Sequence, residues 1–246
     1  MLGAIIGDVI GSVYEWHNTK STEFSLYNRF TRFTDDTVLT IAIADAVLCR
    51  QKHKNKITDY FASKKLYANR LRHYYYQFPD AGYGQKFEEW ARQRDAKPYK
   101  SYGNGSAMRV SPIGFASQSL EEALLESKRS ALVTHNHREG IRGAQAIAAA
   151  VFLARTGSPK TDIKKFIQKR FNYNLEQKLD QIRPNYTFDP SCQGSVPQAI
   201  IAFMESENFE DAIRKAISLG GDSDTIACMT GGIAQAFYKE MPKEMV

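Results

Sequence analysis

Two short acidic clusters hold the residue types best suited to chemistry in this sequence. They are Thr34-Asp35-Asp36-Thr37 and Asp222-Ser223-Asp224-Thr225. Neighbouring carboxylates repel one another, and a divalent cation neutralises them efficiently in a partly buried site. Both clusters offer only carboxylate and hydroxyl oxygens, which suit Mg²⁺, Mn²⁺ or Ca²⁺ rather than Zn²⁺. Four carboxylates could hold two such ions about 3.5–4 Å apart, a spacing used to polarise a substrate oxygen and activate water.

Each cluster also has a purely structural explanation. Carboxylates at a helix N-terminus satisfy free N–H groups and complement the helix dipole. Either cluster alone would be interpreted as a helix cap. The presence of two similar clusters in one chain favours metal binding.

Three other stretches contain candidate binding residues. The glycine-rich stretch 101–109 (SYGNGSAMR) can expose backbone N–H groups to a pyrophosphate, although a plain turn is the alternative. His135 and His137 lie two residues apart, and contact with a ribose or phosphate is a better interpretation than metal ligation. Near the N-terminus, Asp8 and Glu15 are seven residues apart, which places them on one helical face if the helix continues that far. Glu15 could then orient water or a ligand hydroxyl.

Helical periodicity dominates the chain and predicts an all-α fold. Capping residues support several of the helix starts, among them Thr34, Ser119 with Glu122, and Asn208 with Asp211. We expect helices over residues 35–50, from 120 onward, 140–155, 161–170, 197–205, from 209 to the glycines at 220 and 221, and after 225. The alanine-rich helix 140–155 is expected at the centre of the bundle, and residues 171–194 are expected to form a long loop.

Length and composition narrow the class of protein. The chain has 246 residues, of which 43% are hydrophobic, so we expect a single domain over residues 1–246. Three widely spaced cysteines argue against a disulfide framework and a zinc site. The longest apolar run, residues 146–154, is too short to cross a bilayer, and no targeting signal is evident. We therefore expect a soluble cytoplasmic protein.

Basic and aromatic residues are concentrated in the segment 50–100. It contains 13 Lys or Arg against 5 Asp or Glu, within a chain of net charge +6. Interleaved cations and rings can bind phosphates and stack on bases, which would make nucleic acid a partner. In the alternative, the segment forms a solvated basic helix whose aromatic side chains fill the core.

Five motifs, taken together and in order, resemble the ADP-ribosylglycohydrolase family. They are GDVIGSVYE, FTDDT, YGNGSAMRV, THNHREGIRGAQA and GGDSDTIACMTGGIAQAFY, and the resemblance as a whole extends from Gly3 to Tyr238. The resemblance implies a compact orthogonal helical bundle with a dinuclear magnesium or manganese site at its centre. The implied metal ligands are Thr34, Asp35, Asp36, Asp222, Asp224 and Thr225.

The resemblance also implies the roles of other residues. Glu15 would lie beside the metals and the scissile bond. Our own hypothesis is that Asp36 and Asp224 are the bridging or most essential ligands. The expected contacts to ADP-ribose are Gly103, Asn104, Gly105, Ser106, Met108 and His135. The implied reaction releases ADP-ribose from a modified acceptor through an oxocarbenium-like transition state.

Several alternatives stay open at this point. The acceptor could be a protein arginine or serine, an acetyl ester or a nucleic-acid base. The chain could also be a catalytically silent module that binds ADP-ribose. A third alternative is a two-metal nucleotide phosphohydrolase, because the same ions would serve phosphoryl chemistry.

Overall fold

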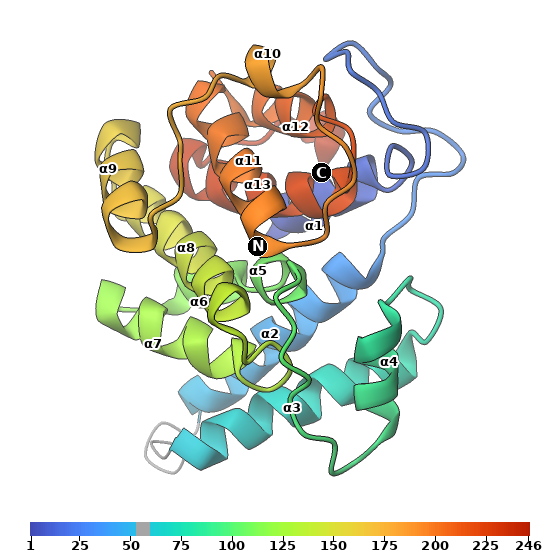
Figure 1. The fold of residues 1–246 in the computed structure, drawn as a ribbon, viewed down its shortest axis with the longest axis vertical. Coiled ribbons are helices and arrows are strands. Elements are labelled where there is room, and N and C mark those ends of the chain that lie inside the picture. The colour runs from blue at the N-terminus through green and yellow to red at the C-terminus, as the bar shows by residue number, and fades with distance from the viewer. Residues whose placement is uncertain (53–59) are drawn as a thin grey trace.

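The computed structural model describes residues 1–52 and 60–246, and helices dominate these two parts (Figure 1). The α-helices are α1 (Leu2–Gly11), α2 (Asp35–Lys52), α3 (Tyr60–Gln77), α4 (Gln85–Arg92), α5 (Gly105–Met108), α6 (Ser111–Ala116), α7 (Leu120–Ala131), α8 (Arg138–Arg155), α9 (Lys160–Phe171), α10 (Leu179–Ile182), α11 (Cys192–Glu205), α12 (Phe209–Ile217) and α13 (Ser223–Tyr238). Within the described residues, extended pairing is limited to an isolated antiparallel bridge between Gly103 and Ser191. The predicted all-α class is confirmed.

Helix α8 lies at the centre of the molecule and contacts helices from both halves. In Figure 1, α1, α11, α12 and α13 fill the upper half, whereas α2, α3, α4 and α7 fill the lower half. Helix α8 packs against α7 and α6 as well as against α11 and α13. Its alanines, such as Ala146 and Ala150, are fully buried. Small side chains permit close helix approach, so the predicted central position is confirmed.

Helices α1 and α13 approach each other closely enough to exclude side chains at two glycines. A Cβ atom on Gly7 would lie 2.1 Å from the carbonyl oxygen of Ala227, and one on Gly11 would lie 2.5 Å from the Cα of Asp224. These distances are far inside van der Waals contact, so only glycine fits. The close packing sets the carboxylate of Asp8 on α1 beside the start of α13.

Several boundary predictions are wrong. Helix α11 begins at Cys192, capped by the Ser191 side chain, which accepts from Gly194 N–H, so Pro197 lies inside the helix rather than in its first turn. The expected loop 171–194 contains α10 and the start of α11. Helix α1 ends at Gly11, so it does not continue far enough to place Glu15 on a helical face shared with Asp8, and Glu15 lies in the following turn.

Other predicted helix starts are confirmed by their capping contacts. The Ser119 side chain accepts from the backbone N–H of Glu122 at 3.1 Å, and Asn208 accepts from Asp211 at 2.9 Å. Gly220 and Gly221 both have positive φ, but α12 ends before them, at Ile217 with Ser218 as its C-cap, so they do not cap the helix as predicted. Helix α13 begins at Ser223 rather than after Thr225.

The aromatic residues of the basic segment 50–100 are mostly core residues. Tyr67, Tyr75, Phe87 and Trp90 are buried, whereas Tyr76 is exposed. Residues 53–59 of this segment lie outside the described residues. Rings buried in the core cannot stack on bases, so the structure favours the alternative of a basic helical surface over an aromatic core.

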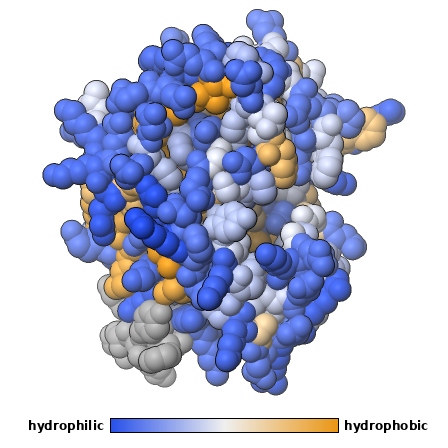
Figure 2. All heavy atoms as spheres, in the orientation of Figure 1, coloured by the Kyte–Doolittle hydropathy of each residue, from blue (hydrophilic) through white to orange (hydrophobic). Residues whose placement is uncertain are grey.

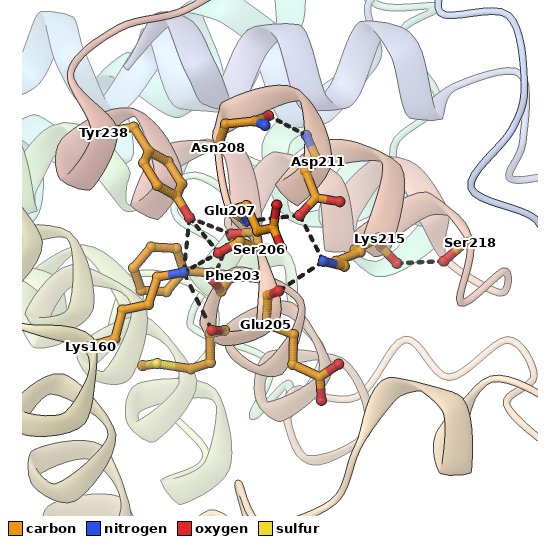
Figure 3. A network of polar contacts seen from close by, with 11 residues as sticks. Lys160, Phe203, Glu205, Ser206, Glu207, Asn208, Asp211, Lys215, Ser218 and Tyr238 are labelled. Atoms are coloured by element: carbon orange, nitrogen blue, oxygen red, sulfur yellow. Dashed lines mark hydrogen bonds and ion pairs between the residues drawn. The ribbon is translucent and has the colours of Figure 1, made fainter.

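Lys160, at the start of α9, binds residues at the ends of α11 and α13 (Figure 3). Its ammonium group donates to the carbonyl oxygens of Met204 and Ser206 and, at 2.8 Å, to the Tyr238 hydroxyl. It also lies 4.8 Å from the ring centroid of Phe203. A cation at a helix C-terminus satisfies free carbonyl groups and complements the helix dipole. This cluster therefore serves helix packing.

The face of the molecule drawn in Figure 2 is largely polar. Figure 2 shows a mainly hydrophilic face on which apolar side chains form separate small patches. Among the described helices, none combines the length and the apolar character that crossing a bilayer requires.

Candidate metal centre and active site

Both acidic clusters and the glycine-rich stretch line one cleft. Its volume is about 740 Å³, and its walls come from the start of α2, the start of α13 and the loops between helices. Twelve of the predicted site residues line it, and eleven of these are Glu15, Thr34, Asp35, Asp36, Gly103, Asn104, Gly105, Met108, Asp222, Asp224 and Thr225. His135 lines it as well. A cleft of this size can hold a ligand as large as a dinucleotide.

Ser106 is the predicted site residue whose side chain does not line the cleft. It is fully buried, and its hydroxyl donates at 2.7 Å to the carbonyl oxygen of Gly140 on α8. The bond holds α5 against α8 below the glycine-rich loop. A contact between the Ser106 side chain and a ligand therefore gains no support from the structure.

Asp8 organises the start of α2. Its carboxylate accepts four hydrogen bonds, from the backbone N–H and the hydroxyl of both Thr34 and Thr37. The bonds from Thr34 measure 2.9 Å for the N–H and 2.6 Å for the hydroxyl. Asp8 is fully buried, and this full set of donors compensates for its desolvation. The Thr34 hydroxyl donates its hydrogen bond to Asp8, so the lone pairs on Oγ1 can bind another partner.

Asp36 connects the two acidic clusters directly. Thr225 donates its hydroxyl to Asp36 Oδ2 at 3.0 Å, although the two residues are 189 positions apart. The other oxygen, Oδ1, is buried and has no hydrogen-bond partner among the described residues. A buried carboxylate oxygen without a partner is costly, so its presence points to a missing cation or donor.

The carboxylates converge in two groups that share Asp224. One group contains Asp8, Asp36 and Asp224, and the other contains Glu15, Asp222 and Asp224; within each, oxygen atoms lie within 4.8 Å of one another. Asp35 lines the same cleft but belongs to neither group.

Asn104 holds one of the clustered carboxylates in place. Its side-chain amide donates at 2.6 Å to Asp222 Oδ2, and both residues are buried. Asn104 is a predicted substrate contact that lines the cleft, and its side chain also contacts a predicted metal ligand. The bond links the glycine-rich loop to the acidic cluster, so the two parts of the site are positioned together.

The electrostatics of the site favour a cation. Burial raises the pKa of Asp36 well above 3.8, and the neighbouring charges of Asp8 and Asp35 raise it further. The pKa of Asp224 is likewise raised well above 3.8, first by burial and then by the charges of Asp222 and Asp36. The pKa of Glu15 is raised by burial and by Asp222. A cation would relieve this repulsion and complete the coordination of Asp36 Oδ1, so the residues present fit a hard divalent metal.

Two functional features could not be identified from local sequence. Asp8 was noted only for its spacing from Glu15, and its burial between α1, α2 and α13 was not expected. A signal was present, because a lone aspartate within the apolar stretch 2–11 must find partners when buried. Arg109 is fully buried beside the cleft, and its surroundings had no signal in the sequence.

Comparisons with known proteins find relatives that match almost the whole chain. The chain is 27% identical to ADP-ribosylhydrolase ARH3 of Xenopus tropicalis, over 98% of this chain and 86% of that protein. It is 29% identical to ADP-ribosylarginine hydrolase Tri1 of Pseudomonas putida (strain GB-1), over 100% of this chain and 72% of that protein. A solved structure, an ADP-ribosylglycohydrolase-related protein complex, has the same fold, with a TM-score of 0.75 at 22% identity over 99% of this chain and 88% of that chain. The family model for ADP-ribosylglycohydrolase matches residues 1–246, and the chain belongs to this family.

Proposed function

We propose that this protein is a metal-dependent hydrolase that releases ADP-ribose from a modified acceptor. The observation that carries the proposal is the pair of carboxylate groups sharing Asp224 at the wall of a large cleft, with a buried and unpartnered oxygen on Asp36. Family membership and the names of the relatives support ADP-ribosyl hydrolysis as the activity.

The proposed ligands of two Mg²⁺ or Mn²⁺ ions are Thr34, Asp35, Asp36, Asp222, Asp224 and Thr225. When bound, such ions supply positive charge that polarises a ligand oxygen and activates water. The chain's own residues would prepare this site before a substrate arrives. Asp8 orients the Thr34 hydroxyl, Thr225 holds Asp36, and Asn104 holds Asp222. Preorganised groups of this kind need little reorganisation during the reaction.

Glu15 is the proposed proton carrier or water-orienting group. It lines the cleft beside Asp222 and Asp224, and its raised pKa brings it closer to the range in which a carboxyl group can exchange a proton at neutral pH. The loop of Gly103 and Gly105, with Met108 and His135, would face the ribose and pyrophosphate.

The nature of the acceptor is a separate part of the proposal. Relatives are named for different activities, one as an ADP-ribosylarginine hydrolase, so an arginine or serine linkage is the first substrate class to test. The nucleic-acid linkage receives no support from the buried rings of the segment 50–100.

Product identification tests the proposal against its two alternatives. The protein is incubated with ADP-ribosylated protein and with free nucleotides, in Mg²⁺, and the products are separated by chromatography. Free ADP-ribose supports the glycosidase, whereas AMP or inorganic phosphate supports a phosphohydrolase. Binding of ADP-ribose without any product supports the silent module.

A further inference from the structure

Three buried residues at the wall of the cleft form a continuous chain of polar contacts. Arg109 Nη2 donates to Thr134 Oγ1 at 2.9 Å, and Thr134 Oγ1 lies 2.7 Å from His135 Nδ1. Arg109 and Thr134 are fully buried, and His135 is 5% exposed. Only His135 among the three was considered as a site residue from the sequence.

We propose that Arg109 and Thr134 are positioning residues that hold His135 in the neutral tautomer with its proton on Nε2. His135 then presents one fixed hydrogen-bond donor to the space beside Gly103 and Gly105. In that state it can act neither as a metal ligand nor as a general base. The role of this donor toward a ligand rests on the proposed function, whereas the tautomer itself does not.

The direction of each hydrogen bond follows from what each group can donate. A guanidinium group has no acceptor, so Thr134 Oγ1 must accept from Arg109. The single Thr134 proton is then free for His135 Nδ1. An Nδ1 atom that accepts is unprotonated, so a neutral ring carries its proton on Nε2.

Burial of the ring and the charge of Arg109 together oppose the binding of a second proton to His135. Burial lowers the pKa of Arg109 to about 10, which still leaves it charged at neutral pH. Burial and then the charge of Arg109 lower the pKa of His135 well below 6.5. The ring therefore stays neutral, and the chain of polar contacts from Arg109 to His135 has one stable arrangement of protons.

The protonated edge of the ring faces the glycine-rich loop. A Cβ atom on Gly105 would lie 3.2 Å from His135 Nε2, and one on Gly103 would lie 3.8 Å from it. No hydrogen-bond partner of Nε2 is found among the described residues, so this donor is available. A neutral N–H donor fits an acceptor oxygen, such as that of a phosphate or a ribose. A Cβ at Gly105 would crowd that position.

The test is ¹⁵N NMR of the histidine rings in the intact protein, with the His135 signals assigned by their loss in His135→Gln. We expect an imine-type Nδ1 and a protonated Nε2 throughout neutral pH. Thr134→Val keeps the shape of the side chain but removes the hydroxyl, so the spectrum should change to a mixture of tautomers or to the Nδ1–H form. Thr134→Ser restores the hydroxyl and should restore the wild-type pattern.

Two results would overturn the proposal. One is a protonated Nδ1 in the wild-type protein, and the other is an unchanged tautomer in Thr134→Val. A parallel titration with ADP-ribose in Mg²⁺ should show about tenfold weaker binding for Thr134→Val, the effect of one hydrogen bond of about 1.4 kcal/mol. If wild-type protein does not bind ADP-ribose, the proposed function fails, while the tautomer is still decided by the spectrum.

Discussion

The carboxylate of Asp8 accepts both the backbone N–H and the hydroxyl of Thr34, at 2.9 and 2.6 Å. The same carboxylate receives the corresponding pair of bonds from Thr37, one helical turn later. The two threonines thus have equivalent contacts with Asp8, yet only Thr34 lines the cleft. A comparison of the two threonines can therefore distinguish a structural role of the hydroxyl, which both share, from a role in metal binding, which only Thr34 can have.

Thr34→Val and Thr37→Val form a matched pair of variants. Each removes one buried hydroxyl bond to Asp8, so each should lower the free energy of unfolding by about 1–2 kcal/mol. Only Thr34→Val should also weaken the binding of Mg²⁺ or Mn²⁺, by about tenfold or more. Isothermal titration on both variants decides the matter, and equal metal affinities would remove Thr34 from the set of ligands.

Asp36→Asn should have opposite effects with and without metal. In chelator, the variant removes one of several crowded carboxylates and should raise the free energy of unfolding by about 1 kcal/mol or more. With divalent cation, the wild-type protein should gain stability through binding, whereas the variant should gain little. Thermal melts in EDTA and in Mg²⁺ measure both effects.

Asp45→Asn on the same helix is the control for Asp36→Asn. Asp45 Oδ2 lies 3.3 Å from Arg70 Nε in a partly exposed ion pair, and Asp45 does not line the cleft. Its replacement should change stability by less than about 1 kcal/mol and leave the response to Mg²⁺ intact. An Asp36→Asn variant that loses stability in EDTA and still responds to Mg²⁺ would contradict the proposed metal site.

His135 should make stability depend on pH in the acidic range. Its pKa is lowered in the folded protein, so below 6.5 the unfolded chain binds more protons than the folded one. The contribution of His135 to stability therefore rises with pH within this window, by up to about 1.4 kcal/mol per pH unit, and is lost again on acidification. The buried carboxyl groups whose pKa is raised, such as Asp36, contribute in the opposite direction. His135→Gln should flatten this slope, whereas replacement of the exposed His73 by Gln should leave it unchanged. The slope is measured by urea unfolding at pH values from about 5 to about 7, a range that includes the ordinary histidine pKa. Identical slopes in the wild type and His135→Gln would contradict the prediction.

Gly11→Ala tests the link between helix packing and the site. The added methyl group would lie 2.5 Å from the Cα of Asp224, so α1 and α13 must separate. We expect a loss of about 1–3 kcal/mol in stability together with weaker binding of Mg²⁺. Gly84→Ala is the control, because its Cβ would meet open space. A Gly11→Ala variant with normal metal affinity would show that the position of Asp224 does not depend on this contact.

Local pattern was sufficient to predict much of the fold. Ser119 and Asn208 begin helices because their side chains satisfy free N–H groups, and this rule depends on neighbours in sequence alone. Pro197 was misleading for the same reason. Proline favours a first turn, but the Ser191 cap starts α11 earlier, and the helix continues through the proline.

The site was predictable in its residue types but not in its contacts. Repulsion between adjacent carboxylates indicated a metal, and both acidic clusters do line one cleft. The bond from Thr225 to Asp36 depends on how α13 packs against α2, which no local pattern specifies. The burial of Asp8 and Arg109 likewise follows from packing between distant helices.

The most direct test of the central claim is release of free ADP-ribose from arginine-linked and serine-linked substrates, measured in Mg²⁺ and in EDTA. The account predicts release from at least one linkage in Mg²⁺, loss of release in EDTA, and a decrease of roughly hundredfold in Asp36→Asn. The Asp45→Asn control should retain activity. Equal release in EDTA, or full activity of Asp36→Asn, would contradict the assignment of the acidic clusters as the metal centre.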